Sequence, residues 1–192
     1  MAYDEFLAER NISSMNTQKF NLILRPWKMD DLENIVKFAN NKKIADNLTD
    51  AFPHPYTRED GIAYIKTFGE HPDRVNDPVR VFAIEVNGIA CGSIGIFPQS
   101  DVHRKNAEMG YWLAEEYWGS GIMTVAVKNM VEYGFRTFDI NRIFARPFSS
   151  NIASQRVLEK AGMKLEGRFE KSLFKNGQFL DELIYSTLKP YP

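Results

Sequence analysis

The segment from Asn106 to Arg136 constrains the fold of this chain more than any other. Its pattern predicts a half-buried strand over residues 107–114, then an aromatic and glycine turn with the sequence YWGSG, then a helix without proline. A glycine turn that leads into a helix presents backbone amides without intrahelical partners, and the helix dipole adds roughly half a positive charge at that end. The segment therefore predicts a phosphate-binding strand–turn–helix unit, with the end of the strand beside it as the place for chemistry.

The composition narrows the class of protein. With 192 residues, 44% of them hydrophobic and 26% charged, the sequence predicts one globular domain over residues 1–192. A net charge of −1 gives no global basic field, so we expect neither nucleic acid nor a membrane as a partner. Cys91 is the only cysteine, which excludes an internal disulfide and favours a reducing, cytoplasmic setting. The N-terminal residues show no secretory signal.

The remaining periodicity predicts a sheet that carries helices. Strands are expected over residues 20–25, 79–86, 89–97, 107–114, 142–148, 163–174 and 178–188. Helices are expected over residues 30–39, 57–68, 122–136 and 151–160. This order is neither a repeating βαβ pattern nor all β. We therefore predict an α/β (α+β) fold, with a mixed, mostly antiparallel sheet of about seven strands and helices on both faces.

Local signals mark several element boundaries. The Asn-Gly pairs at residues 87–88 and 176–177 are strong hairpin signals. Asp31 lies among acidic residues that predict the first turn of a helix. Residues 1–19 are polar and weakly periodic, and we expect them to form a loosely docked arm.

The glycine turn by itself does not identify a ligand. Gly119-Ser120-Gly121 lacks the third glycine of the dinucleotide-binding fingerprint, because position 124 is threonine. No Gly-Lys-Ser/Thr sequence of a P-loop follows it. These differences argue against a nucleotide-phosphate enzyme, in which ATP would compete for the site.

Stretches before and after the turn give it a family context. The strand carries AEMGYWL at residues 107–113, and the sequences SSNIAS and VLEKAGM follow at residues 149–154 and 157–163. Together with the turn, they resemble the GNAT superfamily of acyl-CoA-dependent N-acetyltransferases, and within it the RimJ/RimL type of ribosomal-protein N-terminal acetyltransferase. The resemblance extends from residues 22–25 to residues 181–185 and implies the GNAT, or acyl-CoA N-acyltransferase, fold.

The resemblance implies that acetyl-CoA is the co-substrate and that the turn holds its pyrophosphate. Asn151 would contact the pantetheine arm, although asparagine is also an excellent helix N-cap and the two roles are compatible. Glu116 departs from the family, which often has Gln or Arg there. We expect Glu116 to face solvent, because an acid beside a pyrophosphate is unfavourable. The implied cofactor-binding residues, besides Asn151, are Trp118, Gly119, Ser120, Gly121, Ile122 and Met123.

Glu108 is the candidate general base. A terminal ammonium has an ordinary pKa of about 8, so a carboxylate in the cleft is suited to accept its proton during acyl transfer. Glu108 matches the strand glutamate that the family uses. The alternative is a charged side chain on a solvent-facing strand position, since the residues alternate in polarity here. Asp181 and Glu182, on the last strand, are the alternative carboxylates for this role. Otherwise they would bind a cationic acceptor.

Two further catalytic groups are expected. Many relatives have a tyrosine acid where this chain has Leu158, so the nearby hydroxyl of Ser154, which matches the RimJ/RimL branch, is the candidate acid. Otherwise water protonates the leaving thiolate. A backbone amide between Met109 and Tyr111, where relatives carry a β-bulge, is expected to polarise the thioester carbonyl.

The sequence is compatible with more than one class of acceptor. The loop over residues 52–56 resembles the segment that lines the acceptor cleft in the family, so Phe52, Tyr56 and Asp181 are candidate substrate-binding residues; a proline-stiffened surface loop is the alternative. A protein or peptide α-amine is the preferred acceptor, and a polyamine, amino acid or antibiotic is the rival. A non-catalytic acyl-CoA-binding sensor is a second alternative.

The sequence gives no metal-ligand spacing. Its three histidines, His54, His71 and His103, lie far apart, so we expect no metal. Edge strands near the C-terminal hairpin are compatible with either a monomer or a homodimer.

Overall fold

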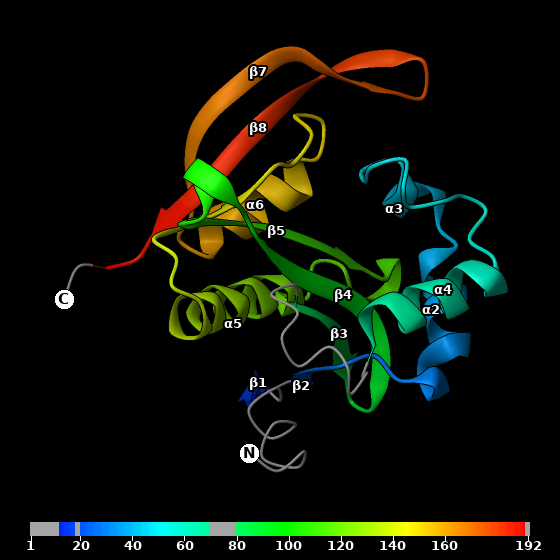
Figure 1. The fold of residues 1–192 in the computed structure, drawn as a ribbon. Coiled ribbons are helices and arrows are strands. Elements are labelled where there is room, and N and C mark those ends of the chain that lie inside the picture. Colours follow the sequence, from blue (N-terminus) through cyan, green and yellow to red (C-terminus); the bar gives the residue numbers. More distant parts are fainter. Residues whose placement is uncertain (1–11, 18–19, 70–79, 191–192) are drawn as a thin grey trace.

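A computed structural model describes residues 12–17, 20–69 and 80–190, and for residues 12–17 it describes only the backbone. These residues form one eight-stranded sheet in the order β1-β2-β3-β4-β5-β6-β8-β7. Figure 1 shows α5 and α6 on one side of the central strands and α2 and α4 on the other. The predicted mixed sheet with helices on both faces is therefore confirmed, with one strand more than expected.

The sheet is antiparallel except between β5 and β6, which run parallel. A parallel pair requires a crossover, and helix α5 provides it. The strands are β1 (Ile12–Thr17), β2 (Phe20–Arg25), β3 (Arg80–Val86), β4 (Ile89–Pro98), β5 (Asn106–Leu113), β6 (Arg142–Ala145), β7 (Lys164–Lys175) and β8 (Gln178–Leu188).

The four expected helices form, and their caps agree with the sequence signals. Thr57 and Asp60 make a reciprocal capping box at the start of α4, and the Asn151 side chain caps α6 by accepting from the Ser154 amide at 3.0 Å. The helices are α2 (Leu32–Ala39), which follows the short 3-10 turn η1 (Met29–Asp31), then α3 (Lys42–Ala45), α4 (Arg58–Phe68), α5 (Ile122–Thr137) and α6 (Ile152–Lys160).

The two helical layers meet opposite faces of β4. Ser93 faces the layer of α2 and α4, where its hydroxyl contacts Trp27 Nε1 at 3.2 Å and the Tyr64 hydroxyl at 2.9 Å. Ile96 faces α5, where a Cβ built on Gly134 would lie 2.5 Å from the Ile96 side chain. Glycine at 134 thus allows α5 to approach the sheet closely, and it fixes the position of the helix beside β5.

Three local expectations differ from the structure. The residues expected to form a loose arm include β1, which pairs with β2. The short helix α3 was not expected. The strand predicted over residues 142–148 ends at Ala145, and Pro147, which has no N–H to donate, follows almost at once. Residue 79 of another predicted strand lies outside the described residues.

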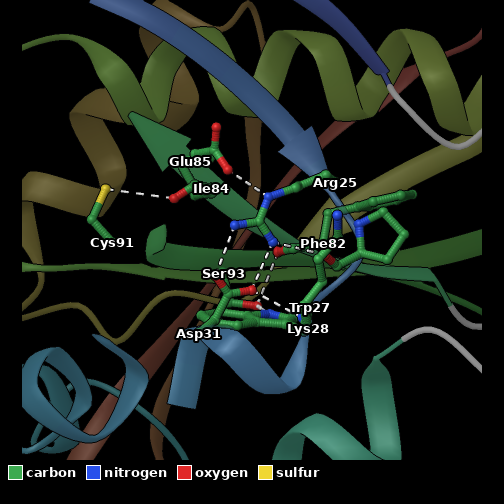
Figure 2. A network of polar contacts seen from close by, with 10 residues as sticks. Arg25, Trp27, Lys28, Asp31, Phe82, Ile84, Glu85, Cys91 and Ser93 are labelled. Carbon is green, nitrogen blue, oxygen red and sulfur yellow. Dashed lines mark hydrogen bonds and ion pairs between the residues drawn. The ribbon is translucent and has the colours of Figure 1, made fainter. Parts of the chain in front are cut away.

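Asp31 has a role that its sequence context did not indicate. Its carboxylate is buried and accepts two hydrogen bonds of 2.7 Å from the Arg25 guanidinium, whose Nε donates to Glu85 at 2.5 Å (Figure 2). The hydrogen bond to Asp31 is the main cause that raises the pKa of Arg25 above its ordinary value. This cluster joins β2, β3 and the start of α2, and so holds the α2 layer on the sheet.

Candidate active site

A cavity of about 830 Å³ opens where β5 and β6 diverge. The parallel ladder ends at the pair Glu108–Phe144, while β5 continues to Leu113. The chain after β6 stays bonded to β8, where the Leu183 amide donates to the Pro147 carbonyl, and residues of α6 line the cavity together with those of β5. The lining consists of residues 43–44 and 46–48 around α3, 109–113 of β5, 117–119 and 121–124 of the turn and α5, and 145–147, 150–154, 156–157 and 160 around α6.

The glycine turn forms one end of this cavity. Gly119 and Gly121 have φ angles of 72° and 85°, in the left-handed region that favours glycine, and no atom lies within 4 Å of the position of a Cβ on either. Trp118 Nε1 donates to the Leu113 carbonyl at 2.7 Å, and the Ser120 hydroxyl donates to the Tyr117 carbonyl at 2.5 Å. The turn is therefore held by its side chains, while its glycine backbone faces open space.

The first turn of α5 supplies donors to the same end. The amide of Val125 bonds to the Gly121 carbonyl, so the amides of Ile122, Met123 and Thr124 precede the first intrahelical hydrogen bond. Gly121 occupies the N-cap position and provides no side-chain cap. The predicted anion cradle thus has the expected geometry, with free amides at the positive end of a 16-residue helix.

The charges around the cradle fit an anion. Glu116 is 57% exposed and lies 3.8 Å from Lys37, so the expectation that it faces solvent is confirmed. Arg156 and Lys160 line the cavity from α6, where their spacing of four residues puts them on one side of the helix. Sequence reasoning missed both, although that spacing, on the helix that carries Asn151, was a usable signal.

Ser154 and Tyr111 meet inside the cavity. The Tyr111 hydroxyl, from β5, lies 2.8 Å from the Ser154 hydroxyl, from the first turn of α6. Burial raises the pKa of Tyr111, an effect that the hydrogen bond with Ser154 partly offsets. Leu158, where relatives have a tyrosine, is fully buried. The sequence singled out Tyr111 for its backbone position, and the structure adds its side chain to the site.

Glu108 does not itself line the cavity, but it contacts a residue that does. Its carboxylate accepts from Arg146 Nε at 3.1 Å, and Glu182 lies 3.7 Å from the same nitrogen. The Glu108 side chain is 31% exposed, so it is neither free in solvent nor sequestered. The sequence contained no signal for Arg146, because nothing local places residue 146 beside residue 108.

The backbone of β5 offers amides to the cavity, but not through a bulge. The β4–β5 register runs without a shift from Gly92–Leu113 to Pro98–Ala107, so the β-bulge expected near residues 109–111 is absent from this strand. The Ala114 amide donates to β4, and amides alternate in direction along a strand. The Tyr111 amide therefore points to the opposite edge, beyond the end of the ladder with β6.

The three candidate substrate-binding residues lie outside the lining of this cavity. Phe52 and Tyr56 pack together with ring centroids 5.3 Å apart, and Phe52 also meets Trp112 at 5.9 Å. Burial raises the pKa of Tyr56. The Asp181 carboxylate accepts from the Lys171 amide at 2.8 Å and from Arg168, and these bonds hold its pKa below the ordinary value. Their role in acceptor binding stays a prediction.

The described residues contain no cluster of three or more His, Cys, Asp or Glu side chains that could hold a metal ion, and His71 lies outside them. Within the same ranges, no helix has the length and apolar character needed to span a membrane.

The fold and the site together define the acetyltransferase class. A family model described as an acetyltransferase (GNAT) domain matches residues 21–164, which is more than half of the chain. The chain therefore belongs to the GNAT family, as its motifs predicted.

Named relatives match this chain over different lengths. YdaF of Bacillus subtilis (strain 168), whose name refers to ribosomal N-acetylation, is 37% identical over 54% of this chain, but the match spans little more than half (56%) of YdaF. The spermidine N(1)-acetyltransferase of Escherichia coli (strain K12) is 26% identical over 81% of this chain and 80% of its own. The structure of RimL, a ribosomal α-N-protein acetyltransferase solved with coenzyme A, superposes with a TM-score of 0.78 at 22% identity, covering 93% of this chain and 97% of RimL. That likeness shows a shared fold.

Proposed function

We propose that this protein is an acetyl-CoA-dependent N-acetyltransferase that acts on a primary amine, preferably a protein or peptide N-terminal α-amine. The observation that supports it most is the uncapped start of α5 beside two left-handed glycines, at the end of a cavity between two diverging strands. An anion cradle, an open channel and a strand edge with a free amide are the three features that a phosphorylated thioester requires.

The residues present fit acetyl-CoA. The amides at the start of α5 would hold the pyrophosphate, with Gly119 and Gly121 leaving the backbone accessible. The Asn151 Oδ1 is engaged by the Ser154 amide, so its Nδ2 group is the part available to a pantetheine amide. When bound, acetyl-CoA supplies an activated acyl group.

The remaining chemistry belongs to the chain. The Tyr111 amide would polarise the acyl carbonyl, and Glu108 would accept the proton that the amine loses. Most of the rate enhancement would come from holding amine and thioester side by side, so that the amine attacks directly and no covalent enzyme intermediate forms. Glu108 lies at the point where β5 and β6 diverge, and its proton transfer would run through a water molecule, since it is outside the cavity lining.

A small amine is the second candidate acceptor. The relatives include a spermidine acetyltransferase as well as a protein whose name refers to the ribosome, so the family supports both kinds of acceptor. The preference for an α-amine rests on the resemblance to the RimJ/RimL branch.

Release of free thiol from acetyl-CoA tests these alternatives. The panel would pair peptides that have a free N-terminus with N-acetylated copies of the same peptides, and would add spermidine and amino acids. Turnover only on free peptide N-termini supports the preferred acceptor, and turnover only on spermidine supports the second. Tight coenzyme A binding by calorimetry without turnover on any amine would identify a sensor.

Glu108→Gln, beside the exposed control Glu132→Gln on α5, tests the base. Loss of turnover in the first variant alone is the expected result. Unchanged turnover and pH profile in Glu108→Gln would show that Glu108 is not the base.

A further inference from the structure

Gly110 is exposed although it lies inside β5, one of the central strands of the sheet. On one side β4 pairs with it through Gly95, whereas on the other side the ladder with β6 ends at Glu108, two residues earlier. Gly110 also lines the cavity. It is therefore a bare piece of strand in the wall of the candidate active site.

Most glycines of this chain have a steric reason that Gly110 lacks. The structure describes all 12 of them. Five have a positive φ angle, namely Gly88, Gly119, Gly121, Gly162 and Gly177. At five others a Cβ would lie less than 3.0 Å from a neighbouring atom, namely Gly61, Gly69, Gly92, Gly95 and Gly134. Gly167 lies at a register shift of β7, where a bulge favours glycine.

The fold itself would accept a side chain at position 110. The φ angle of Gly110 is not positive, and the β4–β5 register is regular on both sides of it. A Cβ built there would meet Phe97 Cε2 at 3.9 Å, an ordinary contact distance. Glycine weakens the interior of a strand, because it loses much conformational freedom on folding and has no side chain to pack. Glycine at such a position is typical of places where a ligand approaches the backbone closely.

The open space at Gly110 lies on the α2 and α4 side of the sheet. Alternate residues of a strand share a face, so a Cβ at position 110 would point the same way as the side chains of Glu108 and Trp112. Trp112 identifies that face, because its ring stacks on Trp27 of the α2 and α4 layer with centroids 6.5 Å apart. The side chain of Tyr111 points the other way, toward α6.

In the proposed reaction, the acceptor must reach two groups that lie on either side of position 110 along β5. Its amine attacks a carbonyl held by the Tyr111 amide at the strand edge, and its proton passes through water to Glu108. The carbon that bears the amine therefore comes close to the Cα of Gly110. Phe97 and Trp112 lie beside this position on the same face.

We propose that Gly110 is a specificity-determining residue for the acceptor. The amine-bearing carbon packs against the Gly110 Cα, and the missing Cβ leaves room for the side chain of the acceptor's first residue. This inference rests on the proposed function and deepens it, because it identifies the position in this chain that limits the size of that side chain.

The test compares the wild type with Gly110→Ala. Gly167→Ala is the matched control, since it also adds a methyl group to an uncrowded strand glycine but lies outside the cavity lining. The acceptors are three peptides that differ only in their first residue, which is glycine, valine or leucine. Gly110→Ala should lower kcat/KM about threefold or less with the glycyl peptide and at least about tenfold with the other two, because the added methyl group competes with the substrate side chain for space. Gly167→Ala should leave all three values within about twofold.

Two further measurements separate this effect from damage to the fold or to the coenzyme A site. The midpoint of urea unfolding for Gly110→Ala should be no lower than that of the wild type, because alanine loses less conformational freedom than glycine in a strand. The affinity for coenzyme A in calorimetry should stay within about twofold, because the new methyl group faces the acceptor side.

An equal loss of kcat/KM with all three peptides, or no loss with any of them, would overturn the inference, since residue 110 would then not limit the first side chain. A coenzyme A affinity that falls together with turnover would also overturn it, because the space would then belong to coenzyme A. A folded wild type that binds no coenzyme A would instead overturn the proposed function itself. Turnover on spermidine and on none of the peptides would overturn the preferred acceptor.

Discussion

Arg146 Nε lies 3.1 Å from Glu108 Oε1, and this contact spans the point at which the parallel strands β5 and β6 separate. Glu108 is the last residue of β5 that pairs with β6, and Arg146 follows the last residue of β6. The backbone on both sides of Arg146 is tied to β8, through the pair Ala145–Tyr185 and the bond from Leu183 to the Pro147 carbonyl. The guanidinium is thus held between Glu108 and Glu182 by the fold.

Replacing Arg146 should disturb the proposed base without affecting the coenzyme A cradle. In Arg146→Gln, Glu108 and Glu182 would face each other without the cation between them, and their repulsion should move Glu108. We expect kcat to fall about tenfold, with the affinity for coenzyme A unchanged, as judged by steady-state kinetics and calorimetry. Arg156→Gln is the matched control: it should weaken coenzyme A binding and change kcat little. If Arg146→Gln instead weakened coenzyme A binding and left kcat unchanged, Arg146 would not act on the acceptor side of the site.

Gly121 and Gly88 allow backbone strain to be separated from ligand binding. Both have a φ angle of 85° and open space where a Cβ would be, but only Gly121 lies at the cavity. Alanine at either position should cost about 1–2 kcal/mol of folding free energy, because the left-handed region is unfavourable for a residue with a Cβ. Gly121→Ala should also reduce coenzyme A affinity at least about tenfold by crowding the cradle. Equal affinities for the two variants in calorimetry would contradict the assigned cradle.

The ion cluster around Arg25 should be important for stability. Its side chain is 13% exposed, and removing it in Arg25→Ala would leave two largely buried carboxylates without their partner. We expect a loss of about 3–5 kcal/mol in the free energy of unfolding by urea. Arg58→Ala breaks an exposed pair with Glu33 and should cost less than about 1 kcal/mol. Similar losses for both variants would mean that the buried cluster contributes no more to the free energy of unfolding than an exposed ion pair does.

Asp181 should make part of the stability dependent on pH. Its pKa is lowered by the Lys171 amide and by Arg168, so its contribution is present above the ordinary carboxyl pKa of about 4 and is lost as the pH falls through the lower folded value. Asp181→Asn should therefore melt below the wild type at neutral pH, and the difference should vanish in acid. A difference in melting temperature that stays constant from neutral to strongly acidic pH would exclude this linkage.

The local elements were predictable because they depend on neighbours in the chain. The Asn-Gly hairpins appear with Asn87 and Asn176 at φ angles of 51° and 50°, as an Asn-Gly turn of this type requires. Asn151 caps its helix, and the glycine turn leads into α5 as expected. The weaker signals failed, because β1 and α3 are short elements with little periodicity of their own. Their contacts are with distant or neighbouring elements: β1 pairs with β2, and Asn41 and Lys43 at α3 bond to Glu115.

Among the site residues, the sequence by itself determined the cradle, because a turn, two left-handed glycines and the first amides of a helix involve only a few consecutive residues. Only the tertiary structure decided which side chains meet across the cavity. Arg146 reaches Glu108 over 38 positions, and Tyr111 reaches Ser154 over 43. The parallel pairing of β5 with β6, and the separation of these two strands beyond Glu108, fix both contacts. No short stretch of the chain encodes either the pairing or the separation.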